Sequence, residues 1–171
     1  MAVLMTDRVM VSEPPELVDE LSQKGLGERQ GTTLLLAPEE ALYLKEKRKE
    51  FNIENSKGKS QGYDDLLKTF MKTDKNFGNK YIVFRDLKDR GFVAKTGFKY
   101  GSDYRIYSRG DKPGKGHAIW LVQVRPEESK CDFSLVSRSV RLAQNVRKKM
   151  IYALLDKEGD ISYYKFEWFK P

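Results

Sequence analysis

A polar stretch at residues 73–79 divides the chain into two parts that differ strongly in charge. Residues 1–79 carry 12 basic and 14 acidic side chains, whereas residues 80–171 carry 20 basic and 11 acidic ones. A chain of 171 residues can hold one domain of ordinary size or two small ones. We therefore predict two domains, at residues 1–78 and residues 79–171, of which only the second is strongly basic.

The net charge of +7 is carried entirely by the second part. A basic surface attracts polyanions, because each phosphate that it contacts releases condensed counterions. Many basic proteins bind no nucleic acid, so charge alone leaves a nucleic-acid ligand and an ordinary basic surface equally open.

Cysteine and histidine are too scarce for the common structural cross-links. A single cysteine, Cys131, excludes an internal disulfide, and one cysteine with one histidine cannot form the usual zinc sites. No apolar run approaches the roughly 18 residues of a membrane helix, and the first five residues are too short for a signal peptide. We expect a cytoplasmic protein without a metal, cofactor or membrane segment.

Hydrophobic periodicity predicts a small α/β domain followed by a mostly β domain with flanking helices, which is an α+β, mixed α/β fold. In the first domain, strands are expected at residues 7–11 and 32–36, and helices at residues 14–25, 38–49 and 63–71. In the second, helices are expected at residues 81–90 and 134–147, and strands at residues 92–96, 103–108, 118–124, 149–155 and 161–168.

The only histidine, His117, stands in a glycine- and lysine-rich loop before an apolar strand. Tyr107 ends the preceding strand and Lys148 lies in a basic cluster further along, at the end of the second predicted helix. Tyrosine, histidine and lysine together can move protons and hold negative charge, which is enough to cleave RNA through its own 2′-hydroxyl. A lone loop histidine is more often a surface residue, so both interpretations stay open on these residues alone.

Arg141, Asn145 and Lys148 are spaced i, i+4 and i+7, which predicts that they share one face of that helix. The strand that ends at Tyr107 and the loop that carries His117 would bring these two residues together. A basic helix face with Lys148 could then complete a cluster of three catalytic side chains. A run of basic residues at a helix end also arises simply because it complements the helix dipole.

Several segments resemble the catalytic subunit of the archaeal tRNA-splicing endonucleases, and together they cover nearly the whole chain. The segments are Leu34 to Leu44, KYIVFRDL from Lys80, RGFV from Arg90, KTGFKYG from Lys95, DYRIY from Asp103, VRLA from Val140 and VRKK from Val146. The resemblance implies a C-terminal nuclease domain of the restriction-endonuclease-like type. It implies, as substrate, precursor tRNA or other RNA folded as a bulge-helix-bulge.

The resemblance also assigns roles to the three candidate catalytic residues. Tyr107 would be the general base on the 2′-hydroxyl, His117 the general acid for the leaving 5′-oxygen, and Lys148 the cation beside the charged transition state. The products would be a 2′,3′-cyclic phosphate and a 5′-hydroxyl. A free tyrosine is only about 0.1% ionised at pH 7. Tyr107 must therefore either have its pKa lowered by Arg105, Arg109 or Lys148, or position the 2′-hydroxyl without ionising.

For RNA binding, the resemblance implies that Arg141 and a second planar side chain clamp a bulged base. Trp168 is the candidate for the second, and packing in the core or between subunits is an equally open role for it. Arg109, Asn145 and Lys149 are further candidates for contacts to RNA. This chain has Gln144 and Asn145 where many relatives have His-Ser, which puts a supporting hydrogen bond there in doubt.

The resemblance further implies a homotetramer, or a two-plus-two tetramer with a structural chain, because a bulge-helix-bulge has two cleavage sites. The aromatic final strand is expected to mediate self-association. The acidic residues Glu127, Glu128 and Asp132 would dock the loop after residue 126 on another subunit, unless that loop is an ordinary surface turn.

Two alternatives remain. Asp103, Glu128 and Lys130 loosely imitate the carboxylate pattern of metal-dependent nucleases, although Glu128 follows Pro126 in a loop. The chain can also be a non-catalytic, RNA-binding or structural subunit of such an endonuclease. Retention of the tyrosine, histidine and lysine together argues against the second alternative.

Overall fold

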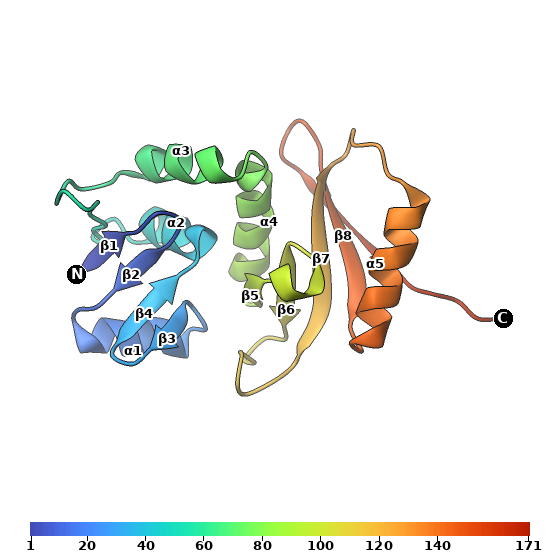
Figure 1. Cartoon of the computed structure of the whole chain (residues 1–171), viewed down its shortest axis with the longest axis horizontal. Helices are drawn as coiled ribbons and strands as arrows, with labels where there is room; N and C mark the ends of the chain where they lie inside the picture. The colour runs from blue at the N-terminus through green and yellow to red at the C-terminus, as the bar shows by residue number, and fades with distance from the viewer. The chain divides into compact units, whose positions relative to one another are not determined.

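The computed structural model describes all 171 residues and forms two compact units, Met1–Gly78 and Asn79–Pro171 (Figure 1). Helices and antiparallel strands occur in both units, which confirms the predicted α+β class. None of the helices combines the length and the apolar character that crossing a lipid bilayer requires.

The first unit is an antiparallel sheet accompanied by three helices. The strands are ordered β1-β2-β4-β3. Their bounds are β1 (Ala2–Leu4), β2 (Val9–Val11), β3 (Glu28–Gln30) and β4 (Thr33–Leu36), and the helices are α1 (Pro15–Gln23), α2 (Pro38–Lys47) and α3 (Tyr63–Thr73). The predicted strands β2 and β4 and all three helices are confirmed. Strands β1 and β3 were not predicted.

Glu40 is the one acidic residue of this unit whose side chain is buried, at 2% exposure. Its Oε2 accepts hydrogen bonds from the backbone N–H of Gly27 at 3.0 Å and of Ala37 at 2.9 Å. Ala37 is the N-cap of α2, so one carboxylate both caps this helix and fixes the loop that precedes β3.

We expect Glu40→Ala to lower the free energy of unfolding by about 2 to 3 kcal/mol, because it leaves two buried backbone donors without their charged acceptor. Urea unfolding followed by the loss of helical signal measures this change. Glu16→Ala is the matched control, since Glu16 is exposed in the first turn of α1. That control should change the free energy by no more than about 0.5 kcal/mol. Equal effects of the two substitutions would contradict the capping role.

The second unit is a five-stranded sheet with a helix on each face. The order is β5-β6-β7-β8-β9, in which only β7 and β8 are parallel. The elements are α4 (Phe77–Asp89), β5 (Val93–Thr96), the short 3-10 helix η1 (Phe98–Tyr100), β6 (Tyr104–Tyr107), β7 (Ala118–Pro126), α5 (Phe133–Asn145), β8 (Lys149–Leu155) and β9 (Ile161–Phe166). Apart from η1, which was not predicted, all of these elements were expected from the sequence.

Parallel pairing of β7 and β8 requires a crossover, and α5 supplies it. Figure 1 shows α4 and α5 on opposite sides of the sheet. Leu121, Met150 and Tyr152 cluster with Val136 and Ala143 of α5. On the other face, the ring of Tyr104 lies 6.0 Å from that of Phe84 in α4. The sheet is therefore buried on both faces around β7 and β8.

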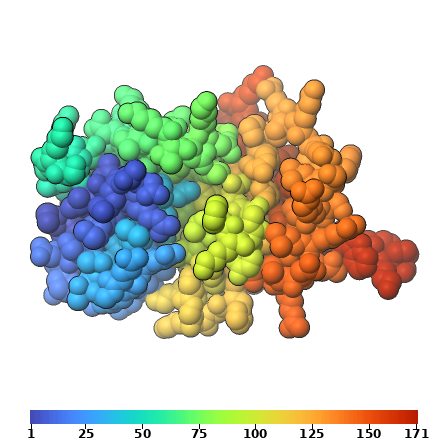
Figure 2. Space-filling model, viewed as in Figure 1, coloured from blue at the N-terminus to red at the C-terminus, as the bar shows by residue number.

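Two predicted boundaries are wrong, and both concern candidate site residues. Helix α5 ends at Asn145, so Lys148 does not share a helix face with Arg141 and Asn145. Strand β9 ends at Phe166, so Trp168 lies beyond it, 56% exposed, in the C-terminal segment that stands out from the unit in Figure 2.

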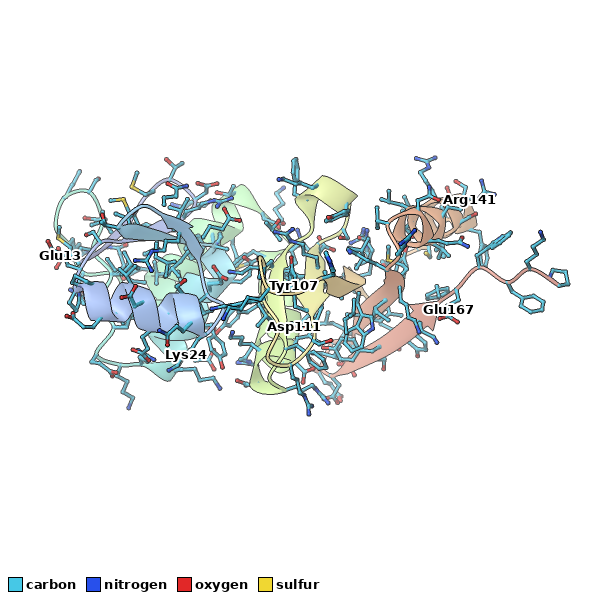
Figure 3. All side chains as sticks on the ribbon, turned by 90° about the horizontal axis from the view of Figure 1, so that it is seen from below. Glu13, Lys24, Tyr107, Asp111, Arg141 and Glu167 are labelled. Atoms are coloured by element: carbon cyan, nitrogen blue, oxygen red, sulfur yellow. The ribbon has the colours of Figure 1, made fainter.

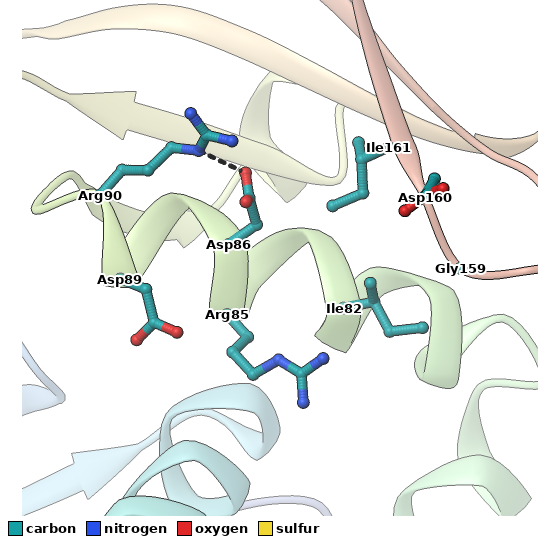
Figure 4. A pocket seen from close by; sticks show the side chains of 8 residues that line it. All are labelled: Ile82, Arg85, Asp86, Asp89, Arg90, Gly159, Asp160 and Ile161. Carbon is teal, nitrogen blue, oxygen red and sulfur yellow. Dashed lines mark hydrogen bonds and ion pairs between the residues drawn. The ribbon is translucent and has the colours of Figure 1, made fainter.

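A mixed-charge cavity of about 600 Å³ lies between α4 and the beginning of β9 (Figure 4). In it, Asp86 pairs with Arg90 Nε at 2.8 Å and accepts a hydrogen bond from the Tyr163 hydroxyl at 2.7 Å. Burial and this bond raise the pKa of Tyr163 far above its usual range. Because acidic and basic groups both line the cavity, it favours no polyanion. The hydrogen bond between Tyr163 and Asp86 links β9 to α4.

Candidate active site

Tyr107 and His117 lie at the same edge of the second sheet. Tyr107 is the last residue of β6, and its register partner is Ala118, the first residue of β7. His117 immediately precedes that partner. The register shifts between Ile106 and Tyr107, because Ile106 pairs with Trp120 and Ile119 is left as an extra residue. This bulge brings His117 one position closer to Tyr107 than regular pairing would, as bulges beside functional sites often do.

Lys148 reaches this edge from the third strand. In the parallel pair β7·β8, Lys149 is the register partner of Trp120, so Lys148 lies beside the beginning of β7. The end of β6 and the beginnings of β7 and β8 thus meet at one edge of the sheet. The fold brings the three candidate catalytic residues to this edge.

The backbone before Lys148 is fixed by a tight helix C-terminus. The N–H of Arg147 donates to the carbonyl of Gln144 at 2.9 Å, and the N–H of Lys148 donates to that of Ala143 at 2.8 Å. This pattern is a Schellman motif, which requires a left-handed residue after the cap. Arg147 holds that position with a φ of 55°, the only positive value among the non-glycine residues. Lys148 therefore leaves the helix through a sharply defined turn.

Tyr107 is buried, with 5% of its surface exposed. Burial raises the pKa of its hydroxyl, and the positive charge of Arg105 opposes this rise only in part. The guanidinium of Arg105 lies 5.9 Å from the Tyr107 ring centre. Of the three candidate cations, Arg105 is the one whose charge lowers the pKa of Tyr107, whereas the guanidinium of Arg109 lies over the ring of Phe92, at 5.4 Å. Tyr107 therefore stays protonated at neutral pH, which favours positioning over ionisation.

His117 and Lys148 differ from Tyr107 in being accessible. His117 is exposed and Lys148 is half-buried. The ammonium of Lys148 lies 5.7 Å from the ring centre of Tyr100, a residue that the sequence reasoning missed. Nothing in the spacing of the KTGFKYG segment distinguishes Tyr100 from a packing residue. A tyrosine hydroxyl, an exposed imidazole and an ammonium can bind and protonate a phosphodiester.

The residues expected to bind RNA lie in two places. Arg141 and Asn145 are exposed on the last turns of α5, where Figure 3 labels Arg141. Lys149 is also exposed and lies 3.7 Å from Glu167. Trp168, Lys148 and Lys149 line one cavity of about 220 Å³. Its other lining residues are Val140, Gln144, Met150, Phe166 and Glu167.

Arg109 lies apart from the cavity beside Lys148, because the aromatic side chains that it contacts belong to the face of the sheet that α4 covers. Its partner Phe92 packs against Trp120, with the ring centres 5.0 Å apart. Trp120 and Phe92 line a cavity together with Leu87 of α4, the helix that covers that face. Any contact of Arg109 with RNA would thus be separate from the cavity beside Lys148.

The acidic loop between β7 and α5 is fully exposed. Asp132 caps α5 by accepting hydrogen bonds from Ser134 N at 2.8 Å and Ser134 Oγ at 3.2 Å. Glu128 pairs with Lys157 at 2.6 Å, and Glu127 has an exposed side chain. The side chain of Phe133, which begins the helix, is 87% exposed. An exposed aromatic group beside exposed acids is typical of a surface that contacts another protein.

The carboxylates of the metal-dependent alternative take part in ion pairs with basic side chains. Asp103 pairs with Lys80 at 3.0 Å and with Arg125 at 3.2 Å, and it accepts the backbone N–H of Val124 at 2.8 Å. Its oxygens therefore have structural partners within the sheet, and Glu128 is bound to Lys157 on another loop. These pairings disfavour a metal site at Asp103 and Glu128.

Known proteins that resemble this chain all point to one family. Residues 77–163 match the tRNA intron endonuclease, catalytic C-terminal domain, and residues 1–67 match the tRNA intron endonuclease, N-terminal domain. A tRNA-splicing endonuclease of Pyrococcus horikoshii is 36% identical over 167 residues, which is 98% of this chain and 95% of that protein. That of Pyrococcus furiosus is 38% identical over 168 residues, again 98% and 95%. That of Methanothermobacter thermautotrophicus is 46% identical over 93 residues, 54% of this chain and 55% of that protein.

Proposed function

The chain belongs to the tRNA intron endonuclease family, and we propose that it cleaves precursor tRNA at exon–intron junctions folded as a bulge-helix-bulge. The RNA's own 2′-hydroxyl is the nucleophile, and the products are a 2′,3′-cyclic phosphate and a 5′-hydroxyl. The observation that supports this chemistry best is the convergence of three strand ends that carry Tyr107, His117 and Lys148.

In the proposed reaction, the O2′–phosphorus bond forms as the phosphorus–O5′ bond breaks. Tyr107, held protonated by burial, hydrogen-bonds to the 2′-hydroxyl and orients it, and the 2′-proton leaves to solvent. His117 in its protonated form donates a proton to the departing O5′ and regains one from water. Histidine suits this step because its ordinary pKa lies near neutrality.

Lys148 stabilises the charge that develops on the non-bridging oxygens of the phosphate. An ammonium group that is already in place contributes more than one that must be drawn from solvent during the reaction. The Schellman turn fixes the backbone of Lys148 before the RNA arrives. The half-buried environment of its side chain weakens solvent screening.

For RNA binding, we propose that Arg141 and Trp168 hold a bulged base, and that Lys149, Asn145 and Arg109 contact the backbone. Stacking on a planar side chain contributes roughly 1 to 3 kcal/mol per base. The accessibility of Trp168 and Arg141 supports this proposal.

We propose that the chain self-associates through β9 and forms a homotetramer, or a two-plus-two tetramer with a related structural chain. Strand β9 ends the sheet, and Tyr163, Tyr164 and Phe166 are 36%, 50% and 39% exposed. An aromatic edge strand of this kind is typically covered by a partner. The loop with Glu127, Glu128 and Asp132 docks on a basic surface of a further subunit.

Light scattering at micromolar protein should detect a dimer or tetramer at low salt. Raising the salt concentration should dissociate the loop contacts before the β9 contacts, because salt screens exposed ion pairs and leaves apolar burial intact. A monomer at low salt would refute the self-association. An oligomer without cleavage would indicate that a structural partner is missing.

Cleavage of a bulge-helix-bulge RNA by the purified chain should continue in excess EDTA, because the proposed chemistry uses only protein side chains. The rate with chelator should lie within about twofold of the rate with Mg²⁺, once the RNA is folded in monovalent salt. Activity that is lost with EDTA and restored by Mg²⁺ would contradict the mechanism. Complete inactivity under both conditions, with tight RNA binding, would favour the non-catalytic subunit.

A further inference from the structure

We propose that Tyr100 is a positioning residue for the cleavage reaction, and that its ring face holds the ammonium of Lys148 where the phosphate will lie. The inference rests on the proposed function, because it assigns a partner to Lys148 within the same site. It is carried by the contact between these two side chains and by the construction of the loop that bears Tyr100.

The loop between β5 and β6 holds its shape through several internal bonds. The N–H of Gly97 donates to the carbonyl of Asp103 at 3.0 Å, and the N–H of Tyr100 donates to that of Gly97 at 2.7 Å. The buried Ser102 hydroxyl donates to the carbonyl of Tyr104 at 3.2 Å. A Cβ at Gly97 would collide with the side chain and backbone of Ser102, so this tight loop requires glycine there.

A buried side chain of the sheet fastens the same loop. Gln123, in β7 and only 7% exposed, donates from its amide nitrogen to the carbonyl of Gly101 at 2.7 Å. Its amide oxygen accepts a hydrogen bond from Arg125 at 2.9 Å, which fixes the orientation of the amide. Gly101 turns the chain with a φ of 61° directly after Tyr100. The residue that carries the ring is therefore anchored on both sides.

The ring itself is packed against the core under α5. Tyr100 is partly buried and contacts the cluster that includes Leu121, Ala143 and Met150. Ala143 is also the residue whose carbonyl accepts the N–H of Lys148. The ring of Tyr100 and the backbone of Lys148 thus both contact Ala143 or its immediate neighbours. The ammonium lies 5.7 Å from the ring centre, within the range of a cation–π interaction.

Lysine needs such a partner more than most cations do. Its ammonium is a point charge at the end of a flexible four-carbon chain, and ordering that chain costs rotamer entropy. A fixed aromatic face attracts the ammonium without neutralising it, whereas a carboxylate would neutralise its charge toward the phosphate. Tyr100 also lies close enough to Tyr107 to influence its ionisation.

The test compares Tyr100→Phe, which keeps the ring, with Tyr100→Leu, which removes it. We expect Tyr100→Leu to slow single-turnover cleavage at saturating enzyme about 3- to 30-fold, the range set by partly buried cation–π contacts. RNA affinity should change less than twofold, and Tyr100→Phe should cleave within twofold of the wild type. The expected signature is a loss in rate without a loss in binding, rescued by phenylalanine.

Tyr43 provides a matched control, because the ammonium of Lys47 lies over its ring at 5.4 Å in the first unit. Tyr43→Leu removes the same kind of contact, far from the proposed chemistry in the sequence, and should leave the cleavage rate within twofold. Should Tyr100→Leu fail to fold, phenylalanines with increasing ring fluorination at position 100 keep the shape and weaken the ring face in steps. The rate should then fall in the same steps.

Three outcomes would overturn the inference. Cleavage by Tyr100→Leu at the wild-type rate, or cleavage rates that do not fall as ring fluorination increases, would show that the ring does not act through Lys148. An equal defect in Tyr100→Phe would assign the role to the hydroxyl. A loss confined to RNA affinity would make Tyr100 a binding residue. Inactivity of the wild type, both alone and together with a structural partner chain, would instead contradict the proposed function.

Discussion

Replacing His117 with alanine should slow cleavage about 10²- to 10⁴-fold and leave RNA affinity nearly unchanged. The rate falls because the departing 5′-oxygen loses its positioned proton donor. Affinity holds because one imidazole contributes little to a surface whose binding is dominated by lysine and arginine. Single-turnover cleavage at saturating enzyme measures the rate, and filter binding measures the affinity.

Lys115→Ala is the control for this variant, since Lys115 is exposed in the same loop two residues earlier. It should lower the affinity slightly and leave the rate at saturation unchanged. If His117→Ala cleaves within a few-fold of the wild type, His117 is only a surface residue. The tyrosine and lysine at the same edge would then need a different proton donor.

Lys148→Ala should cause a rate loss of similar size, with a small additional loss of affinity because a positive charge is removed. The rate falls because the transition state carries more negative charge than the substrate, and a fixed ammonium stabilises that difference. Measuring both quantities across salt concentration separates the two effects, since only the affinity should follow the salt dependence of phosphate contacts.

Lys149→Ala removes the same charge from the next residue and serves as the matched control. Lys149 is exposed and pairs weakly with Glu167, whereas Lys148 is half-buried beside Tyr100. The control should weaken binding and leave the rate at saturation within about twofold. Comparable rate defects in the two variants would mean that general basic charge, and not the position of Lys148, assists the reaction.

The fold was largely accessible from the sequence because apolar periodicity and turn residues agree along most of the chain. Proline at the first helical position and glycine after the end located α1, and a run of β-branched and then apolar residues located β4. Strand β3 was missed because Glu28–Gln30 contains only exposed polar residues, and pairing with β4 alone makes it a strand. Tertiary contacts decide such elements.

The site was less accessible, because its geometry depends on contacts between distant segments. The end of α5 was misplaced since Arg147, and not glycine, adopts the left-handed conformation, so no sequence signal marks the turn before Lys148. The raised pKa of Tyr107 follows from burial, which the sequence does not display. Tyr100 contacts Lys148 from the loop between β5 and β6, which Gln123 of β7 fastens at Gly101, and the sequence displays neither contact.

The most direct test of the proposed chemistry is the identity of the ends left on the cleaved RNA. Attack by the 2′-hydroxyl predicts a 2′,3′-cyclic phosphate on the upstream fragment and a 5′-hydroxyl on the downstream one. Mass spectrometry of fragments from a bulge-helix-bulge RNA, cleaved by the purified chain in EDTA, distinguishes these ends. A 3′-hydroxyl with a 5′-phosphate would show that water is the nucleophile and would contradict the account.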